Sequence, residues 1–501
     1  MNADKNDFDV VVVGGGNAAL CAALSAREEG ARVVLLERAP EPERGGNSRY
    51  TEGLMRFVYN NVDDLRALAP DLTDDEIAGS DFGAYTEAEF FDDMARVTQN
   101  RTDPDLCEIL VKNSYSAMHW LRKHGVRFMP QFGRQAFNID GKFKFWGGAT
   151  MAAWGAGPGL VDALYKAVEQ CGIEIVYDAW AQDLVRTDAS VSGVVAKVKG
   201  TSRTYSARAV VLACGGFEAN TEWRARYLGR GWDLVKVRGT KYNTGDGLAM
   251  ALRIGAQPCG HWSGCHAIGW ERYAPDFGDL SVTDDLERSS YPFAVFVNAD
   301  GKRFLDEGAD FRNYTYAKYG AVVLEQPGQF AWEIYDSKVL HLLRSEYRMK
   351  HVTKVKADTL EELVAKMDDV NGEQLLKTIK EFNAAVRTDI PFDPNSKDGR
   401  CAQELAIPKS NWANRIDTPP YEAYAVTCGI TFTFGGLRIT QDAQVVDSNH
   451  EPMGGLFAAG EMVGGLFYFN YPGSTGLTSG TVFGRIAGRS AARVARNNGV
   501  A

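Results

Sequence analysis

Histidine and cysteine are scarce in this chain of 501 residues, which contains seven histidines and eight cysteines. No C-x-x-C pair occurs, and the spacing of the closest cysteines, Cys259 and Cys265, fits neither a zinc site nor an iron–sulfur cluster. We therefore predict that the protein has no metal site. The cysteines are expected to be reduced thiols in the core or in loops.

Long apolar runs and a basic leader are also missing. The N-terminal segment MNADKNDFD is neither basic nor apolar, which predicts no signal peptide. No stretch reaches the roughly 20 apolar residues that a membrane span needs. The net charge of −10 argues against nucleic acid or an anionic membrane surface as the main partner. We expect a cytoplasmic protein whose 45% hydrophobic content can fill the cores of two or three domains.

The most informative segment runs from Asp9 to Asn17 and reads DVVVVGGGN. Four valines predict a strand buried on both faces, Gly14 and Gly16 permit a tight turn, and AALCAALSAREEG has helical spacing. Glu37 closes a second apolar strand, ARVVLLE, roughly 20 residues later. This order predicts a dinucleotide site in which the helix N-terminus binds the pyrophosphate and Glu37 binds a ribose hydroxyl.

Further glycine-rich segments indicate that the dinucleotide is FAD. The turn RGGNS at 44–48 directly follows the second strand, where a nicotinamide enzyme would normally continue with a plain helix and strand. The segment LFAAGEM at 456–462 is a short strand ending in Gly-Glu. The segment GLTSG at 476–480 opens a helix whose N-terminal dipole can stabilise an anionic reduced flavin. Each segment alone is compatible with an ordinary loop, whereas all of them in this order favour FAD.

A resemblance to a known family extends over nearly the whole chain. It is carried by the strings GGGNAAL, LLERAP, GGNSRYTEG, AVVLACGGF, NTGDGLAMALRIGA, GKRFLDE, GGLFAAGE and GLTSGTVFGRIAG. With these strings the chain resembles the FAD-dependent fumarate reductase and succinate dehydrogenase flavoprotein superfamily. Within it, GGNSRYTEGLMRF, GHWSGCHAIGW and FYFNYPGSTGL are most similar to the tricarballylate dehydrogenases, which oxidise tricarballylate to cis-aconitate.

The resemblance implies an α/β fold with a Rossmann-like FAD-binding domain, attached antiparallel strands and an inserted α+β capping domain. The expected limits are 1–260 and 432–501 for the FAD-binding domain and 261–431 for the cap. Alternating short strands and turns over 174–214 predict the antiparallel strands, and a helical pair is expected near 359–386.

The motifs and the resemblance together predict the residues that bind FAD. Covalent relatives attach the flavin through a histidine after the second strand, and GGNSRYTEG contains none, so the FAD is expected to be non-covalent. The predicted cofactor-binding residues are Gly14, Gly16, Asn17, Ala18, Ala19, Glu37, Arg38, Gly45, Gly46, Asn47, Ser48, Gly215, Gly216, Asp246, Gly460, Glu461, Gly476, Leu477, Thr478 and Ser479.

The resemblance also implies catalytic residues. His266 in SGCHAIGW stands where relatives have a histidine that contacts a substrate carboxylate, and Glu307 and Arg312 in GKRFLDEGADFRNY lie near the carboxylate and arginine that relay a proton. Buried against each other, such a pair would hold an arginine ready to exchange a proton. Tyr471 is expected beside the reacting carbons, and Tyr468 is expected to pack. Structural roles, as a core histidine, a surface ion pair or packing aromatics, remain alternatives.

Three departures from fumarate reductases argue against fumarate as the substrate. The arginine after a Phe-Asp motif is missing from IYDSKVLHLLR, where Lys338 and Arg344 are approximate substitutes. Phe432 stands in place of a second histidine, and NYPGSTG lacks the arginine that precedes the last helix. Tyr471-Pro-Gly instead resembles the Tyr-Pro-Gly of ketosteroid dehydrogenases, where the tyrosine helps to hold or ionise the substrate.

Chemistry favours a flavin for the expected reaction. Desaturation beside a carboxylate removes a weakly acidic proton and a hydride, and the flavin N5 suits this hydride better than nicotinamide does. Cations that can offset substrate charge lie at Arg272, Arg288, Lys302, Arg303, Arg312, Lys318, Lys338, Arg344 and Arg348.

We therefore expect desaturation of a polycarboxylate, namely tricarballylate to cis-aconitate, with electrons passed to a separate acceptor protein or quinone-linked partner. Two other interpretations stay open. One is a related oxidoreductase, either a steroid or enone dehydrogenase or an enoate reductase. The other is an electron-delivery flavoprotein with a degenerate substrate site.

Overall fold

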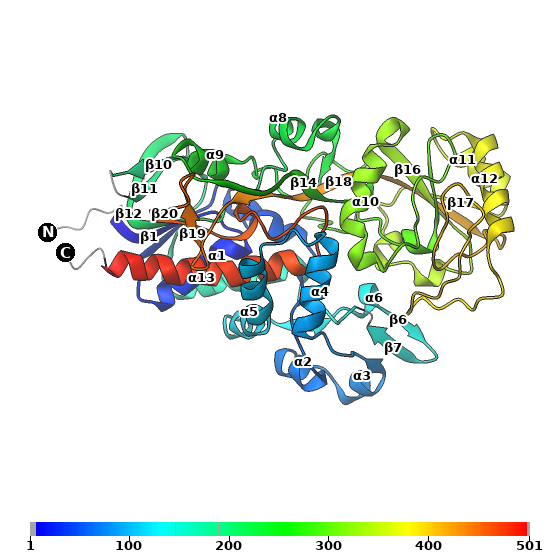
Figure 1. Ribbon diagram of the computed structural model, residues 1–501, viewed down its shortest axis with the longest axis horizontal. Coiled ribbons are helices and arrows are strands. Elements are labelled where there is room, and N and C mark those ends of the chain that lie inside the picture. Colours follow the sequence, from blue (N-terminus) through cyan, green and yellow to red (C-terminus); the bar gives the residue numbers. More distant parts are fainter. Residues whose placement is uncertain (1–6, 146, 188–189, 498–501) are drawn as a thin grey trace.

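A computed structural model describes residues 7–145, 147–187 and 190–497 of the chain (Figure 1). An eight-stranded sheet lies at one end of the long axis, with its main path in the order β10-β11-β12-β1-β2-β9. The bounds are β1 (Asp7–Val13), β2 (Val33–Leu36), β9 (Glu174–Val176), β10 (Ala179–Arg186), β11 (Val191–Val198), β12 (Thr201–Leu212), β19 (Gln444–Val446) and β20 (Pro452–Ala458). β20 pairs with β12, and β19 pairs with β20.

The centre of this sheet is the predicted nucleotide-binding core. β1 is parallel to both β2 and β12, and its valines are buried, as expected of a strand covered on both faces. Helices α1 (Asn17–Glu28) and α13 (Thr475–Asn497) pack against each other and against β1 and β12. Their close approach requires glycine, because a Cβ at Gly488 would lie 2.0 Å from the carbonyl oxygen of Ala22. The α/β fold class expected from the sequence is confirmed.

The strands over 174–214 agree with the prediction except at β9. β10, β11 and β12 form an antiparallel meander. β9 instead pairs in parallel with β2, with Val34 opposite Glu174, and so extends the nucleotide-binding sheet. α7 (Ala156–Gln170) directly precedes β9, at the end of the long connection from β2 that a parallel pair of strands requires.

A second sheet of six strands lies toward the other end of the molecule (Figure 1). It consists of β13 (Lys236–Val237), β14 (Pro258–Glu271), β15 (Val295–Asn298), β16 (Phe330–Tyr335), β17 (Lys354–Ala357) and β18 (Tyr421–Leu437). α10 (Tyr316–Leu324) packs on β14, and the expected helical pair is present as α11 (Leu360–Lys366) and α12 (Gly372–Ala385). The predicted domain limits fall inside β14 and β18, and they stay predictions.

Smaller elements complete the chain. Two three-stranded sheets contain β3 (Leu54–Met55), β5 (Phe128–Pro130) and β8 (Met151–Ala153), and β4 (Ser80–Asp81), β6 (Ala136–Ile139) and β7 (Lys142–Phe145). The other helices are α2 (Val62–Leu68), α3 (Asp74–Ala78), α4 (Glu87–Val97), α5 (Pro104–Lys123), α6 (Phe132–Gln135), α8 (Thr221–Trp223) and α9 (Asp246–Arg253). Within the described ranges, no helix is long and apolar enough to cross a membrane.

Candidate active site

The glycine turn after β1 has the geometry of an anion site. Gly14 adopts a φ of +116°, and a Cβ there would lie 2.3 Å from the carbonyl oxygen of Ala213. α1 begins at Asn17 without a side-chain cap at Gly16, so its first backbone N–H groups face the cavity beyond the turn. Of these groups, the Asn17 N–H donates to the Ser48 hydroxyl at 3.1 Å.

Most predicted cofactor residues line one cavity that continues from this turn. They are Gly14, Gly16, Asn17, Ala18, Glu37, Arg38, Gly46, Asn47, Ser48, Gly215, Asp246, Gly460, Glu461, Gly476, Leu477 and Ser479. Four predicted residues do not line it. Ala19 is buried in the core, and Gly45 is the left-handed residue directly before the 3-10 helix Gly46–Tyr50. A Cβ on Gly216 would lie 2.2 Å from a carboxylate oxygen of Glu461, and the Thr478 hydroxyl donates to the Arg56 carbonyl.

The residues of this cavity fit FAD. Gly16 and Gly46 face each other: a Cβ on Gly46 would lie 3.7 Å from the Gly16 Cα. Side chains at these two positions would fill the space between the two backbone segments. α13 begins at the cavity as well, and the Asn17 amide ties the two helix ends together by donating to the Leu477 carbonyl at 2.9 Å. The Glu37 carboxyl group is buried beside the first glycine turn, and burial raises its pKa. Its oxygens can accept hydrogen bonds from hydroxyl donors such as those of a ribose.

A second part of the same cavity is built around His266. This residue lies on β14 opposite Phe432 of β18, directly before a register shift in the strand pairing. Its ring is 4.9 Å from that of Tyr471, 5.1 Å from that of Tyr316 and 5.2 Å from that of Phe432, between ring centroids. Burial, and then the charge of Arg238, hold the pKa of His266 well below its usual value. The imidazole is therefore neutral at pH 7, and its two nitrogens have no hydrogen-bond partner among the described residues.

Two tyrosine hydroxyls meet beside this ring. The Oη atoms of Tyr316 and Tyr471 are 2.6 Å apart, and both side chains are buried. Burial raises the pKa of each tyrosine, so both hydroxyls stay protonated at neutral pH. Only one proton can lie between the two oxygens, which leaves the other proton available for a ligand.

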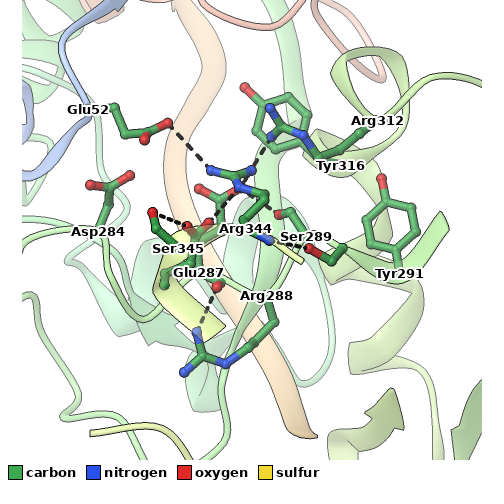
Figure 2. Close-up of polar contacts among 12 residues, drawn as sticks. Glu52, Asp284, Glu287, Arg288, Ser289, Tyr291, Arg312, Tyr316, Arg344 and Ser345 are labelled. Atoms are coloured by element: carbon green, nitrogen blue, oxygen red, sulfur yellow. Dashed lines mark hydrogen bonds and ion pairs between the residues drawn. The ribbon is translucent and has the colours of Figure 1, made fainter. Parts of the chain in front are cut away.

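A charged cluster closes this end of the cavity, and Figure 2 shows the Arg312 and Arg344 side chains turned toward Glu287. The Glu287 Oε1 atom is 2.9 Å from Arg344 Nη1 and 3.5 Å from Arg312 Nη1. Its Oε2 atom is 3.8 Å from Arg238 Nη2. Glu52 reaches the cluster from the FAD side, with its Oε2 atom 3.5 Å from Arg344 Nη2.

The surroundings of the cluster set the charge of its arginines. Asp284 lies 3.4 Å from Arg238, and this carboxylate together with Glu287 outweighs burial, so the pKa of Arg238 is raised. Burial, and then the charge of Arg344, lower the pKa of Arg312. A guanidinium stays protonated in proteins all the same, so these arginines are cations.

The structure does not bring Glu307 and Arg312 together as a buried pair. The Glu307 carboxylate accepts hydrogen bonds from the Arg303 guanidinium at 2.5 and 2.9 Å and from the Phe296 N–H at 3.0 Å. These contacts lie away from the cavity. Arg303 is nearer along the chain and occupies both carboxylate oxygens. Arg312 lines the cavity and contacts Glu287 instead.

Of the other residues singled out from the sequence, some lie at the cavity or in the charged cluster and some do not. Tyr471 lines the cavity, whereas Tyr468 stacks on His261 at 6.0 Å. Of the two substitutes for the missing arginine, Arg344 belongs to the charged cluster and Lys338 pairs with Asp336 at 2.7 Å.

Sequence reasoning missed Glu52, Arg238, Glu287 and Tyr316. Tyr316 follows Arg312 by four residues, and the Arg312 Cζ atom lies 5.2 Å from the centre of the Tyr316 ring, so proximity in the chain was the local signal for this residue. Within the described residues, no group of three or more histidine, cysteine, aspartate or glutamate side chains could hold a metal ion.

Comparison with known proteins identifies the class. The model of the FAD binding domain family matches residues 9–477, so the chain belongs to this family of flavoproteins. It is an FAD-dependent oxidoreductase of the fumarate reductase and succinate dehydrogenase flavoprotein superfamily.

Three known proteins show how near the relatives are. The chain is 31% identical to a probable fumarate reductase, Ifc3, of Shewanella frigidimarina (strain NCIMB 400), over 97% of this chain and 74% of the relative. The open conformation of a flavocytochrome c3 fumarate reductase matches with a TM-score of 0.74 and 28% identity, over 98% of this chain and 79% of that chain. A 3-ketosteroid delta1-dehydrogenase from Sterolibacterium denitrificans matches with a TM-score of 0.74 over 98% and 100% of the two chains; at 20% identity this is a likeness of fold.

Proposed function

We propose that the protein desaturates a small polycarboxylate by removing two hydrogens from neighbouring carbons, with tricarballylate to cis-aconitate as the expected reaction. One observation carries the proposal: Arg238 and Arg312 line the same cavity as the FAD motifs and His266. Arginines that line a cofactor cavity are suited to planar carboxylates, which they bind through two parallel hydrogen bonds.

FAD and the residues of the cavity have different roles in this reaction. Bound FAD supplies the hydride acceptor. Arg238 and Arg312 offset the charge of the substrate carboxylates, and neutral His266 offers one ring N–H donor and one acceptor nitrogen. Of the expected proton path, Arg312 reaches the cavity and Glu307 does not. The two electrons then pass to a separate acceptor, either a protein or a quinone-linked partner.

The non-covalent attachment of FAD belongs to the same proposal. The segment GGNSRYTEG after β2 contributes Gly46, Asn47, Ser48, Thr51 and Glu52 to the cavity, and none of these carries an imidazole. The cavity holds the cofactor through backbone groups, Glu37 and two helix ends.

A second candidate is an enone or ketosteroid dehydrogenase. It is favoured by the Tyr316–Tyr471 hydroxyl pair, which sits against His266 and Phe432 and can donate a neutral hydrogen bond to a carbonyl oxygen. It is also favoured because every arginine near the cavity contacts a protein carboxylate.

Anaerobic mixing separates these functions. The FAD-loaded protein is mixed with tricarballylate, succinate or a 3-ketosteroid, and bleaching of the flavin absorbance is followed. Rapid bleaching by tricarballylate supports the proposal, and bleaching by the ketosteroid alone replaces it with the second candidate. No bleaching by any compound, with rapid reduction by another redox protein, would indicate an electron-delivery flavoprotein. The matched control is Tyr468→Phe, which alters a tyrosine that does not line the cavity and should bleach like the parent.

A further inference from the structure

The arginines at the substrate end of the cavity are already bound to a carboxylate of the protein. Arg238, Arg312 and Arg344 come from three separate segments, and all three reach the single carboxylate of Glu287. Glu287 is itself buried and lines the cavity. A carboxylate-binding site built from these arginines therefore contains an internal anion.

The contacts of Glu287 are unequal in length. Its Oε1 atom is 2.9 Å from Arg344 Nη1 and accepts a hydrogen bond from the Ser289 hydroxyl at 2.5 Å. The contacts with Arg312 at 3.5 Å and with Arg238 at 3.8 Å are longer, and they belong to the two arginines that line the cavity. An incoming carboxylate can bind Arg312 or Arg238 while Glu287 stays on Arg344 and Ser289.

This arrangement places two negative groups near each other. A substrate carboxylate on Arg312 would share that guanidinium with Glu287, in a cavity that Glu52 also lines. Like charges at such separations repel strongly when little water lies between them. Each further substrate carboxylate meets the same repulsion, because the charges of these three arginines are matched by Glu52, Asp284 and Glu287.

We infer that Glu287 determines specificity by limiting how many substrate carboxylates the site accepts. The inference rests on the proposed function, since it concerns carboxylates bound at that same site. Glu287 competes for Arg312 and Arg238 and so weakens the binding of succinate relative to a monocarboxylate, and of tricarballylate relative to succinate.

The test compares the FAD-loaded parent with Glu287→Gln, which keeps the shape and removes the charge. Binding of propionate, succinate and tricarballylate is measured at fixed ionic strength by the change in the flavin absorption spectrum. In Glu287→Gln we expect tricarballylate to bind at least tenfold more tightly than in the parent, succinate to gain less, and propionate to change least. A gain that grows with ligand charge does not follow from a structural role of Glu287.

Two control variants separate charge from packing. Glu346→Gln removes another carboxylate that contacts Arg344, at 2.5 Å, but one that does not line the cavity. It should change all three affinities less than Glu287→Gln does, because its carboxylate lies outside the cavity. Glu287→Asp keeps the charge and shortens the side chain, so it should keep the discrimination of the parent.

Two outcomes would overturn the inference. In one, Glu287→Gln binds the three acids with unchanged or weaker affinity while the parent binds tricarballylate. In the other, Glu346→Gln shows the same charge-dependent gain. If the parent binds none of the acids, the proposed function itself fails, and this result is distinct from the first two.

A measurement on the parent protein alone keeps the inference testable if Glu287→Gln does not fold. Succinamate replaces one carboxylate of succinate by a neutral amide of similar shape. It should bind the parent at least as tightly as succinate does. Clearly tighter binding of succinate would contradict a repulsive Glu287.

Discussion

His266 is a polar ring placed where the protein offers it no hydrogen-bond partner within the described residues. Leaving buried nitrogens unpaired normally costs free energy, so such a group suits a ligand that satisfies it. His266→Ala should therefore slow tricarballylate-dependent flavin reduction, or raise the half-saturating concentration of tricarballylate, by roughly 10²-fold. This is the usual effect of losing one contact to a desolvated carboxylate. FAD content should stay at the parent level.

The control for this prediction is Glu37→Ala, which alters the other end of the cavity and should lower FAD content first. Stopped-flow bleaching and the ratio of flavin to protein absorbance measure the two effects. Unchanged kinetics in His266→Ala at full FAD content would remove His266 from the substrate site.

The neutral state of His266 also predicts how stability depends on pH. The folded protein lowers its pKa well below the ordinary 6.5 because of burial. Below that pH the unfolded chain takes up a proton that the folded chain does not, so the free energy of unfolding falls with falling pH, by up to about 1.4 kcal/mol per unit from this one group. His266→Phe keeps an aromatic ring among its neighbours and removes the titration. The loss in melting temperature between about pH 7.5 and about pH 5.5 should therefore be smaller in His266→Phe than in the parent.

At the scale of helices and strands, the sequence predicts local features and misses long-range contacts. The strand, glycine turn and helix over 9–28 follow from periodicity and glycine placement within a few residues. The parallel pairing of β9 does not, because it depends on which strand the chain returns to. The cluster around Glu287 was not predictable either, because Arg344 lies 57 residues from Glu287 and 292 residues from Glu52 in the chain. Which of these charged side chains are buried, and which pair with one another, is decided only when the folded chain brings distant segments together.

The two long strands β14 and β18 give the expected cap motion a specific location. They pair over most of their length, so a hinge inside them would break ladder hydrogen bonds. Register shifts between His261 and Cys265, and directly after His266, already interrupt this ladder beside the cavity. We predict that residues of the cap, about 261–431, move as a unit by bending at these irregularities.

Hydrogen exchange checks this prediction. Saturating tricarballylate should slow exchange at 261–267 and across the cap, and it should reduce limited proteolysis there. β1 and β12, which lie in the other sheet, serve as the internal reference and should not change. Equal exchange of the cap with and without ligand would argue against closure.

The whole molecule is organised around the FAD cavity, whose lining extends from Val13 to Gly480 and includes residues of both large sheets. A cofactor held there contacts segments that are distant in the chain, so its binding free energy adds to the stability of the complete fold. At a hundredfold excess over its dissociation constant this contribution is about 2.7 kcal/mol.

Because no histidine follows β2 in GGNSRYTEG, the attachment is expected to be non-covalent. Acid precipitation should therefore release all the yellow colour into the supernatant. Gentle removal of FAD should lower the melting temperature, and added FAD should restore it. Flavin that remains in the washed pellet would show a covalent bond and would contradict the prediction.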